Sequence, residues 1–445
     1  MSQLVTQENK YQSAFRDLRQ STNMRRQRWF DRLRENAMSR FGELGIPTVD
    51  QEDWKYTNLA SLARVDFDPV VVSTRATIPV ETIEQYSYPE SANSRLVLVN
   101  GILQKDLSSL ENANEIVVMD LVDAVADDRY GDLIREHLAR GAVHETSGLV
   151  ALNTAMITSG AFVFVPRGIA LKAPLHILCL SDSDGPEVAT FPRILIVAEE
   201  NSSATVIESY GGRHDSQYFT NAIVEVVVKD AARLEHYRVQ RETSKAFHIA
   251  TTSIELGRQS TYDATAINLG GQLARHEINL VMNEEGAECW LDGLYITGSG
   301  QHTDTHSMID HRQPHCTSRQ LYKGILEGSS RAVFNGKIFV RHGAQKTDAM
   351  QTNKNLLLSP EARVDTKPQL EIFADDVKCA HGAAVGQIAE EELFYLETRG
   401  IHPDLGRNLL TYGFAEEVIG KIKVESIKAQ LDEAVLNRLN TRLEA

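Results

Sequence analysis

Cys379 and His381, a cysteine and a histidine two positions apart, are the candidate metal-binding residues of this chain. They lie in the segment 370–386, LEIFADDVKCAHGAAVG, which is typical of two short strands joined by a tight irregular turn. Because side chains alternate between the two faces of a strand, Cys379 and His381 share one face. A thiolate beside an imidazole forms a soft donor pair that suits iron or zinc.

Two donors cannot complete a tetrahedral metal site, and nothing nearby along the chain supplies two more thiols. The pair would therefore be half of a site, with the remaining ligands coming from another strand or another chain. From the spacing alone, the favoured interpretation is a buried cysteine beside a histidine that is bonded for structural reasons.

The net charge and the cysteine content of the 445-residue chain exclude several classes of protein. A formal net charge of -15 argues against non-specific binding to nucleic acid and is compatible with a basic protein partner. No apolar window has the length of a membrane-spanning helix, and the amino terminus lacks the apolar core of a signal peptide. Four cysteines without CxxC spacing exclude a disulfide framework and a self-contained cysteine-based metal module. We therefore expect a cytoplasmic protein that does not contact a membrane.

Hydrophobic periodicity divides the chain into three regions. Residues 1–150 form a helical and mixed amino-terminal region, and 387–445 return to a helical period, with a second helix beginning at Pro403 and running to Gly413. Between them, residues 151–386 contain short β-rich runs punctuated at intervals of about ten residues. Such runs could build a sandwich, a barrel or a β-solenoid. Asn335-Gly336 and Asp292-Gly293 lie inside runs and not between them, which weakens a meander of hairpins and favours the stacked coils of a solenoid.

Several motifs carry a resemblance to a known family over about 51–414. They are EDWKYTNL, ALNTAMITSGAFVFVPRGIALKAPLHIL, HCTSRQLYKGILEGSSRAVFNG, and the combination of AQKT with DDVKCAHG. Together they resemble the SufB/SufD family of the Suf iron–sulfur cluster assembly machinery. The single Cys379-Ala380-His381 motif looks like the SufD branch more than the SufB branch.

The resemblance implies a mainly β fold, with a right-handed parallel β-helix core flanked by amino- and carboxy-terminal helical regions. It implies a non-catalytic subunit that pairs with a SufB-like subunit through the β-helix. Cys379 and His381 match the family's interface positions, where iron or a nascent Fe–S cluster would be shared transiently with the partner chain. No cofactor held tightly by this chain alone is expected.

The resemblance also implies further partners. A SufC-like ABC ATPase would dock on the carboxy-terminal helices, and a cysteine desulfurase with its sulfur carrier (SufS/SufE-like) would supply sulfur to the complex. The residues expected in the ATPase-docking region are Leu393, Phe394, Leu396, Leu409 and Phe414.

Two other functions stay open at this point. A homodimer of this chain would bring two Cys379 and two His381 together and could carry a cluster or a metal ion. A β-helix enzyme acting on carbohydrate should show clustered carboxylates and aromatic side chains, whereas Asp375 and Asp376 point to opposite faces if their strand is regular.

A histidine-rich tract offers a second candidate metal site. It contains His302, His306, His311, His315 and Cys316. Such a tract can bind metal, but a structural or interface role for these residues is the favoured interpretation.

Overall fold

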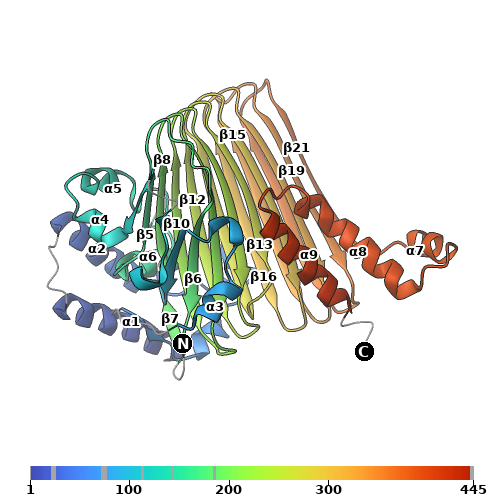
Figure 1. Ribbon diagram of the computed structural model, residues 1–445, viewed down its shortest axis with the longest axis horizontal. Helices are drawn as coiled ribbons and strands as arrows, with labels where there is room; N and C mark the ends of the chain where they lie inside the picture. Colours follow the sequence, from blue (N-terminus) through green and yellow to red (C-terminus); the bar gives the residue numbers. More distant parts are fainter. Residues whose placement is uncertain are drawn as a thin grey trace.

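The chain is described by a computed structural model over residues 2–21, 27–71, 78–111, 115–142, 144–183 and 187–440. Its centre is a solenoid of about eight turns, in which each turn contributes one strand to each of two facing sheets. Figure 1 shows these strands side by side, from β5 near the amino-terminal helices to β21 at the opposite end. The predicted parallel β-helix with helical regions at both ends of the chain is confirmed.

The two sheets are called sheet A and sheet B here, and the space between them is called the lumen. From β5 onward the strands of each sheet pair in parallel. Sheet A contains β5 (Ala161–Val165), β7 (Val188–Thr190), β8 (Arg193–Ala198), β10 (Phe219–Val228), β12 (Phe247–Leu256), β14 (Leu273–Met282), β16 (His302–His311), β18 (Arg331–Val340) and β20 (Arg363–Ile372). Sheet B contains β6 (Leu175–Ser181), β9 (Ser203–Gly212), β11 (Arg233–Arg241), β13 (Thr261–Asn268), β15 (Glu288–Thr297), β17 (Thr317–Leu326), β19 (Asp348–Leu357) and β21 (Lys378–Gly386).

The amino-terminal region closes the first turn of the solenoid. It extends sheet A with β4 (Val117–Asp120) and sheet B with β2 (Arg95–Val99), and β3 (Ile102–Leu103) and β1 (Asp68–Pro69) add short pairings. Its helices are α1 (Ser2–Ser21), α2 (Arg28–Leu44), α3 (Val80–Gln85), α4 (Leu121–Val125), α5 (Gly131–His137) and α6 (Gly148–Ala155). Short 3-10 turns occur at Glu52–Trp54, Leu62–Arg64, Pro89–Ser91 and Lys105–Leu107.

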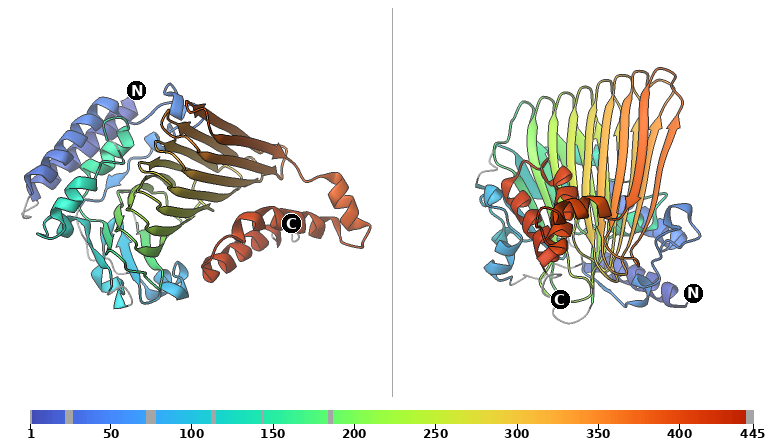
Figure 2. Two further views of the ribbon diagram at one scale, coloured as in Figure 1. Left: turned by 90° about the horizontal axis from the view of Figure 1, so that it is seen from above. Right: turned by 90° about the vertical axis from the view of Figure 1, so that its right-hand side faces the viewer.

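Helices cover the outer faces of the two sheets on opposite sides (Figure 2). Apolar side chains of α1, α2 and α6 pack with Phe219 and Phe247 on the outer face of sheet A. The carboxy-terminal helices are α7 (Glu390–Glu397), α8 (Pro403–Ile419) and α9 (Glu425–Asn440). The second half of α8 and α9 pack on the outer face of sheet B, where Val418 and Leu431 meet Tyr237 and Leu294. The helix that begins at Pro403 therefore continues past the expected end at Gly413 to Ile419, because that part buries an apolar face.

The segment EDWKYTNL is docked on the outer face of sheet A. Trp54 lies against the Arg275 guanidinium, 4.0 Å from the ring centroid. The Thr57 hydroxyl donates to Asp304 (2.5 Å) and lies 2.8 Å from His302 Nε2. Thr57 and Asp304 are buried, and Asp304 also accepts from the Arg275 guanidinium (2.5 Å), so the Thr57 hydroxyl completes a buried polar network.

Thr57→Val should destabilise the protein by about 1–3 kcal/mol, because it leaves the buried Asp304 carboxylate and His302 imidazole without their hydroxyl partner. Thr48→Val is the matched control, since the Thr48 hydroxyl is exposed. Urea denaturation of the two variants measures the difference. Equal unfolding free energies for the two variants would contradict a structural role of this contact.

Buried histidines give the fold a pH dependence. Burial lowers the pKa of His176 to about 3 and that of His311 to about 4. The unfolded chain takes up these protons near pH 6.5 and the folded chain does not, so stability is lost as the pH falls below that value. Each histidine should lower the free energy of unfolding by roughly 2 kcal/mol as the pH falls from 6.5 to 5. Urea midpoints measured at both pH values test this, and an unchanged midpoint would refute it.

Within the described residues, no helix combines the length and the apolar character needed to cross a bilayer.

Candidate functional site

Cys379 and His381 lie on β21, the last strand of sheet B. Their Cα partners on β19 are Ala349 and Gln351, and both of these residues are buried on the lumen side of the sheet. Because residues in parallel register share a face, Cys379 and His381 also project toward the lumen side, at its final rung. The predicted common face of the two residues is thus confirmed.

The final rung is open to solvent. β21 pairs with β19 alone and β20 with β18 alone among the residues that the structure describes. His381 and most of β21 are exposed, and so are the apolar side chains of Met350, Ile372 and Val385. A sheet edge of this length with unpaired backbone groups and exposed apolar side chains is a surface suited to another chain.

The two donors differ in their surroundings. Cys379 is half-buried and packs against a small apolar cluster that includes Ala344 and Ala349. Burial raises the pKa of the Cys379 thiol above its ordinary value. The thiol is therefore protonated at neutral pH, and a metal ion that binds it must displace the proton.

The described part of the chain supplies no third ligand. It contains no group of three or more His, Cys, Asp or Glu side chains that could hold a metal ion. The remaining cysteines, Cys179, Cys289 and Cys316, are buried away from β21. Asp375 and Asp376 lie in the connection between β20 and β21, as the expected irregular turn requires, so the condition of a regular strand is not met for them.

The histidine-rich tract forms β16 and the turn after it, and its polar contacts are structural. On the outer face, His302 meets Thr57, and His306 Nε2 lies 3.1 Å from the Asp304 carboxylate. His311 points into the lumen, where its Nε2 lies 2.9 Å from the Ser318 hydroxyl. These contacts agree with the favoured interpretation of the tract.

A buried ionic cluster in the lumen was not foreseen from the sequence. His236 lies between the Glu208 carboxylate (3.0 Å) and the Tyr262 hydroxyl (2.8 Å). His248 lies in the same way between the Glu242 carboxylate (2.7 Å) and the Arg238 guanidinium (2.5 Å). In the matching neutral tautomer, each imidazole accepts a hydrogen bond from Tyr262 or Arg238. The other ring nitrogen of each histidine lies within ion-pair distance of a carboxylate and makes no aligned hydrogen bond. The cluster is buried inside the lumen and belongs to the fold.

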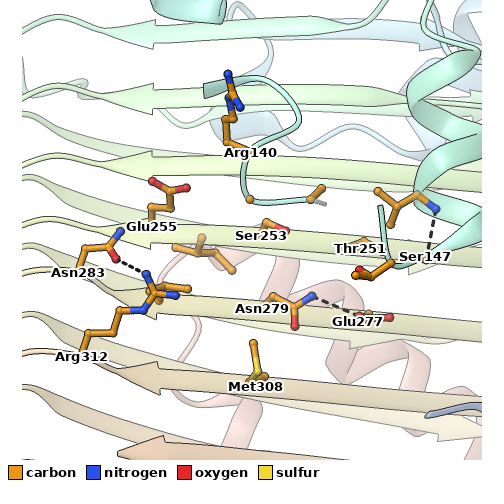
Figure 3. A pocket seen from close by; sticks show the side chains of 16 residues that line it. Arg140, Ser147, Thr251, Ser253, Glu255, Glu277, Asn279, Asn283, Met308 and Arg312 are labelled. Atoms are coloured by element: carbon orange, nitrogen blue, oxygen red, sulfur yellow. Dashed lines mark hydrogen bonds between the residues drawn. The ribbon is translucent and has the colours of Figure 1, made fainter. Parts of the chain in front are cut away.

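A polar hollow of about 390 Å³ lies on the outer face of sheet A (Figure 3). Arg312 donates to Asn283 (3.0 Å) and Asn279 donates to Glu277 (3.3 Å), while burial raises the pKa of Glu255. The lining residues that the structure describes include neither Cys379 nor His381, so the hollow is separate from the donor pair, and they include no aromatic side chain on which a sugar ring could stack.

The residues expected to dock an ATPase fall into three groups. Phe394 and Leu409 are exposed, at 66% and 47%, and Tyr395 and Leu405 are exposed beside them. Leu393 and Leu396 instead pack against Gly406, and so join α7 to α8. Phe414 lies under the Lys323 ammonium, 4.3 Å from the ring centroid, and packs with the cluster on sheet B. Figure 1 shows α7 and the start of α8 extending away from the sheets.

The fold and the open rung define a class of protein, and the comparisons with known proteins name it. The family described as SUF system FeS cluster assembly, SufBD core domain, matches residues 179–414, and the SufBD protein N-terminal region matches residues 5–177. The chain belongs to the SufBD family.

Within that family, its relatives include proteins named SufD. The iron–sulfur cluster assembly protein SufD of Escherichia coli is 34% identical, over 90% of each chain. That of Bacillus subtilis is 27% identical, over 91% of this chain and 92% of the relative. A SufBD family protein of Synechocystis is 37% identical, over 90% of this chain and 89% of the relative.

Proposed function

We propose that this chain is the SufD-type, non-catalytic subunit of a cytoplasmic Suf complex that assembles iron–sulfur clusters. The observation that carries the proposal is the soft donor pair, Cys379 and His381, on an uncovered last rung of a SufBD-family β-helix. Iron or a nascent cluster is the cargo of this site. Two donors from this chain require further ligands from a second chain, which would be a SufB-like subunit joined edge to edge.

The carboxy-terminal helices would receive a SufC-like ABC ATPase. The exposed residues Phe394, Tyr395, Leu405 and Leu409 offer an apolar and aromatic surface of the kind that dominates protein interfaces. α8 continues without a break from this surface to its anchored half on sheet B. A nucleotide-driven movement of the ATPase would therefore be carried to the solenoid through one rigid helix. Sulfur would come from a cysteine desulfurase and its carrier.

The experiment is to measure iron and acid-labile sulfide in the chain purified alone and after co-expression with SufB-like and SufC-like subunits. We expect cluster iron and sulfide in the co-expressed complex and neither in the isolated chain. A complex that assembles but never contains sulfide, under conditions where other Suf complexes do, would refute the proposal.

A second candidate is a homodimer that carries a cluster. The exposed last rung supports it, because two copies joined there would bring two Cys379 and two His381 together. Native mass spectrometry separates the two functions. A metal-loaded homodimer that persists when the partner subunits are present would favour the carrier.

A further inference from the structure

Three polar side chains, those of Gln320, Gln351 and His381, lie in a row along sheet B, and this row is called the file here. Gln320 on β17, Gln351 on β19 and His381 on β21 are successive Cα partners in register. They therefore project from sheet B along one line toward the open rung. Gln320 and Gln351 are buried, whereas His381 is exposed.

The hydrogen bonds of this file all point inward. Gln351 Nε2 donates to Gln320 Oε1 (2.7 Å), and Gln320 Nε2 donates to the Ser307 hydroxyl (2.8 Å). This direction leaves a carbonyl oxygen at the outer end. Gln351 Oε1 is buried and has no hydrogen-bond partner among the described residues. A buried acceptor without a hydrogen bond lowers the stability of the fold by about 1–3 kcal/mol, so this oxygen requires a donor.

A glycine on the opposite sheet makes room for the Gln351 carboxamide. A Cβ at Gly336 would lie 2.3 Å from Gln351 Nε2, which is closer than atoms can approach. Gln351 is 0% exposed, so its amide is held by Gln320 on one side and by the Gly336 backbone on the other. The unpaired oxygen therefore belongs to a buried, fixed amide on the strand next to the one that carries His381.

We propose that Gln351 is a positioning residue for His381. When a partner chain covers the final rung, the His381 imidazole donates its N–H to Gln351 Oε1. This bond selects one neutral tautomer and leaves the other ring nitrogen, with its lone pair, directed at the shared site. Histidines that bind metal generally hold their second nitrogen in this way. The inference rests on the proposed function and adds the residue that prepares His381 for its cargo.

The test uses the full chain in the assembled complex with ¹⁵N-labelled histidine. The His381 signals are assigned by their loss in His381→Gln, and the ring ¹⁵N shifts report the tautomer. We expect one tautomer in the wild type and a mixture in Gln351→Met, which keeps the volume but removes the acceptor. Cluster output of Gln351→Met should fall roughly 10- to 100-fold.

Two further variants keep a folding defect from imitating this result. Gln351→Glu retains an acceptor oxygen but loses the Nε2 donor to Gln320, so its urea midpoint is measured first. Where that midpoint equals the wild-type value, the variant should preserve the single tautomer. Gly336→Ala displaces the carboxamide without changing Gln351 and should reproduce the tautomer mixture. The inference is overturned if wild type and Gln351→Met show the same tautomer ratio. It is also overturned if Gln351→Glu with the wild-type urea midpoint shows the same tautomer mixture as Gln351→Met.

Failure of the proposed function gives a different pattern. Full cluster output from His381→Ala would reject the role of His381 in assembly, whatever its tautomer. Loss of output in His381→Ala, together with a tautomer that is insensitive to Gln351, would reject only the positioning role.

Discussion

His381→Ala is expected to reduce cluster production in cells by about tenfold or more, while folding and subunit assembly stay intact. The reason is the position of the side chain. His381 is exposed on the last rung and no described contact of the fold depends on it, so its removal should change the unfolding free energy by no more than about 0.5 kcal/mol. Cluster production is measured as the activity of iron–sulfur enzymes in a strain that depends on this chain.

His315→Ala is the matched control, because His315 is also exposed but lies in the turn after β16 and away from β21. It should leave cluster production unchanged. Normal enzyme activities in the His381→Ala strain, or an equal defect in the His315→Ala strain, would contradict the assignment of the site.

Replacing Phe394 and Leu409 together by alanine is expected to weaken binding of the ATPase subunit by about 30-fold or more, since truncating a hot-spot side chain costs at least about 2 kcal/mol. Both side chains are exposed and make few contacts within the chain, so the melting temperature should not change. Isothermal titration calorimetry with the purified ATPase measures the affinity.

Leu431→Ala should give the opposite pattern. Leu431 is buried between α9 and sheet B, and its truncation should cost about 2–5 kcal/mol of stability while ATPase binding stays intact below the unfolding temperature. Removal of the whole carboxy-terminal region is a poorer experiment, because it would expose Tyr237 and Leu294 on sheet B. Unchanged ATPase affinity in the double variant would place the docking surface elsewhere.

The position of two interior glycines could be predicted from the sequence, but their structural role could not. The sequence places Asn335-Gly336 and Asp292-Gly293 inside strand-like runs, and the structure confirms this within β18 and β15. The sequence could not say why. Gly336 makes room for the Gln351 amide, and a Cβ at Gly293 would lie 2.1 Å from the Tyr322 ring. Both neighbours are distant along the chain, so only the register of the coils reveals them.

The docking residues illustrate the same limit. Helical periodicity identified apolar positions in the carboxy-terminal region but could not tell which of them face solvent. Phe414 packs with sheet B and Leu393 packs with α8, whereas Phe394 and Leu409 are exposed. The distinction depends on where α8 meets β15 and β17, which is a contact between distant parts of the chain.

Local periodicity in the sequence predicts a β-rich core, the helical regions and the shared face of Cys379 and His381, because a strand alternates its side chains every second residue. The parallel β-helix itself is implied by the family resemblance. That the pair lies on an uncovered last rung, next to the strand that carries the unpaired Gln351 oxygen, follows only from the tertiary structure. Solvent exposure and cross-strand neighbours depend on which strands pair, and that pairing joins residues too far apart in the chain for any local pattern to encode.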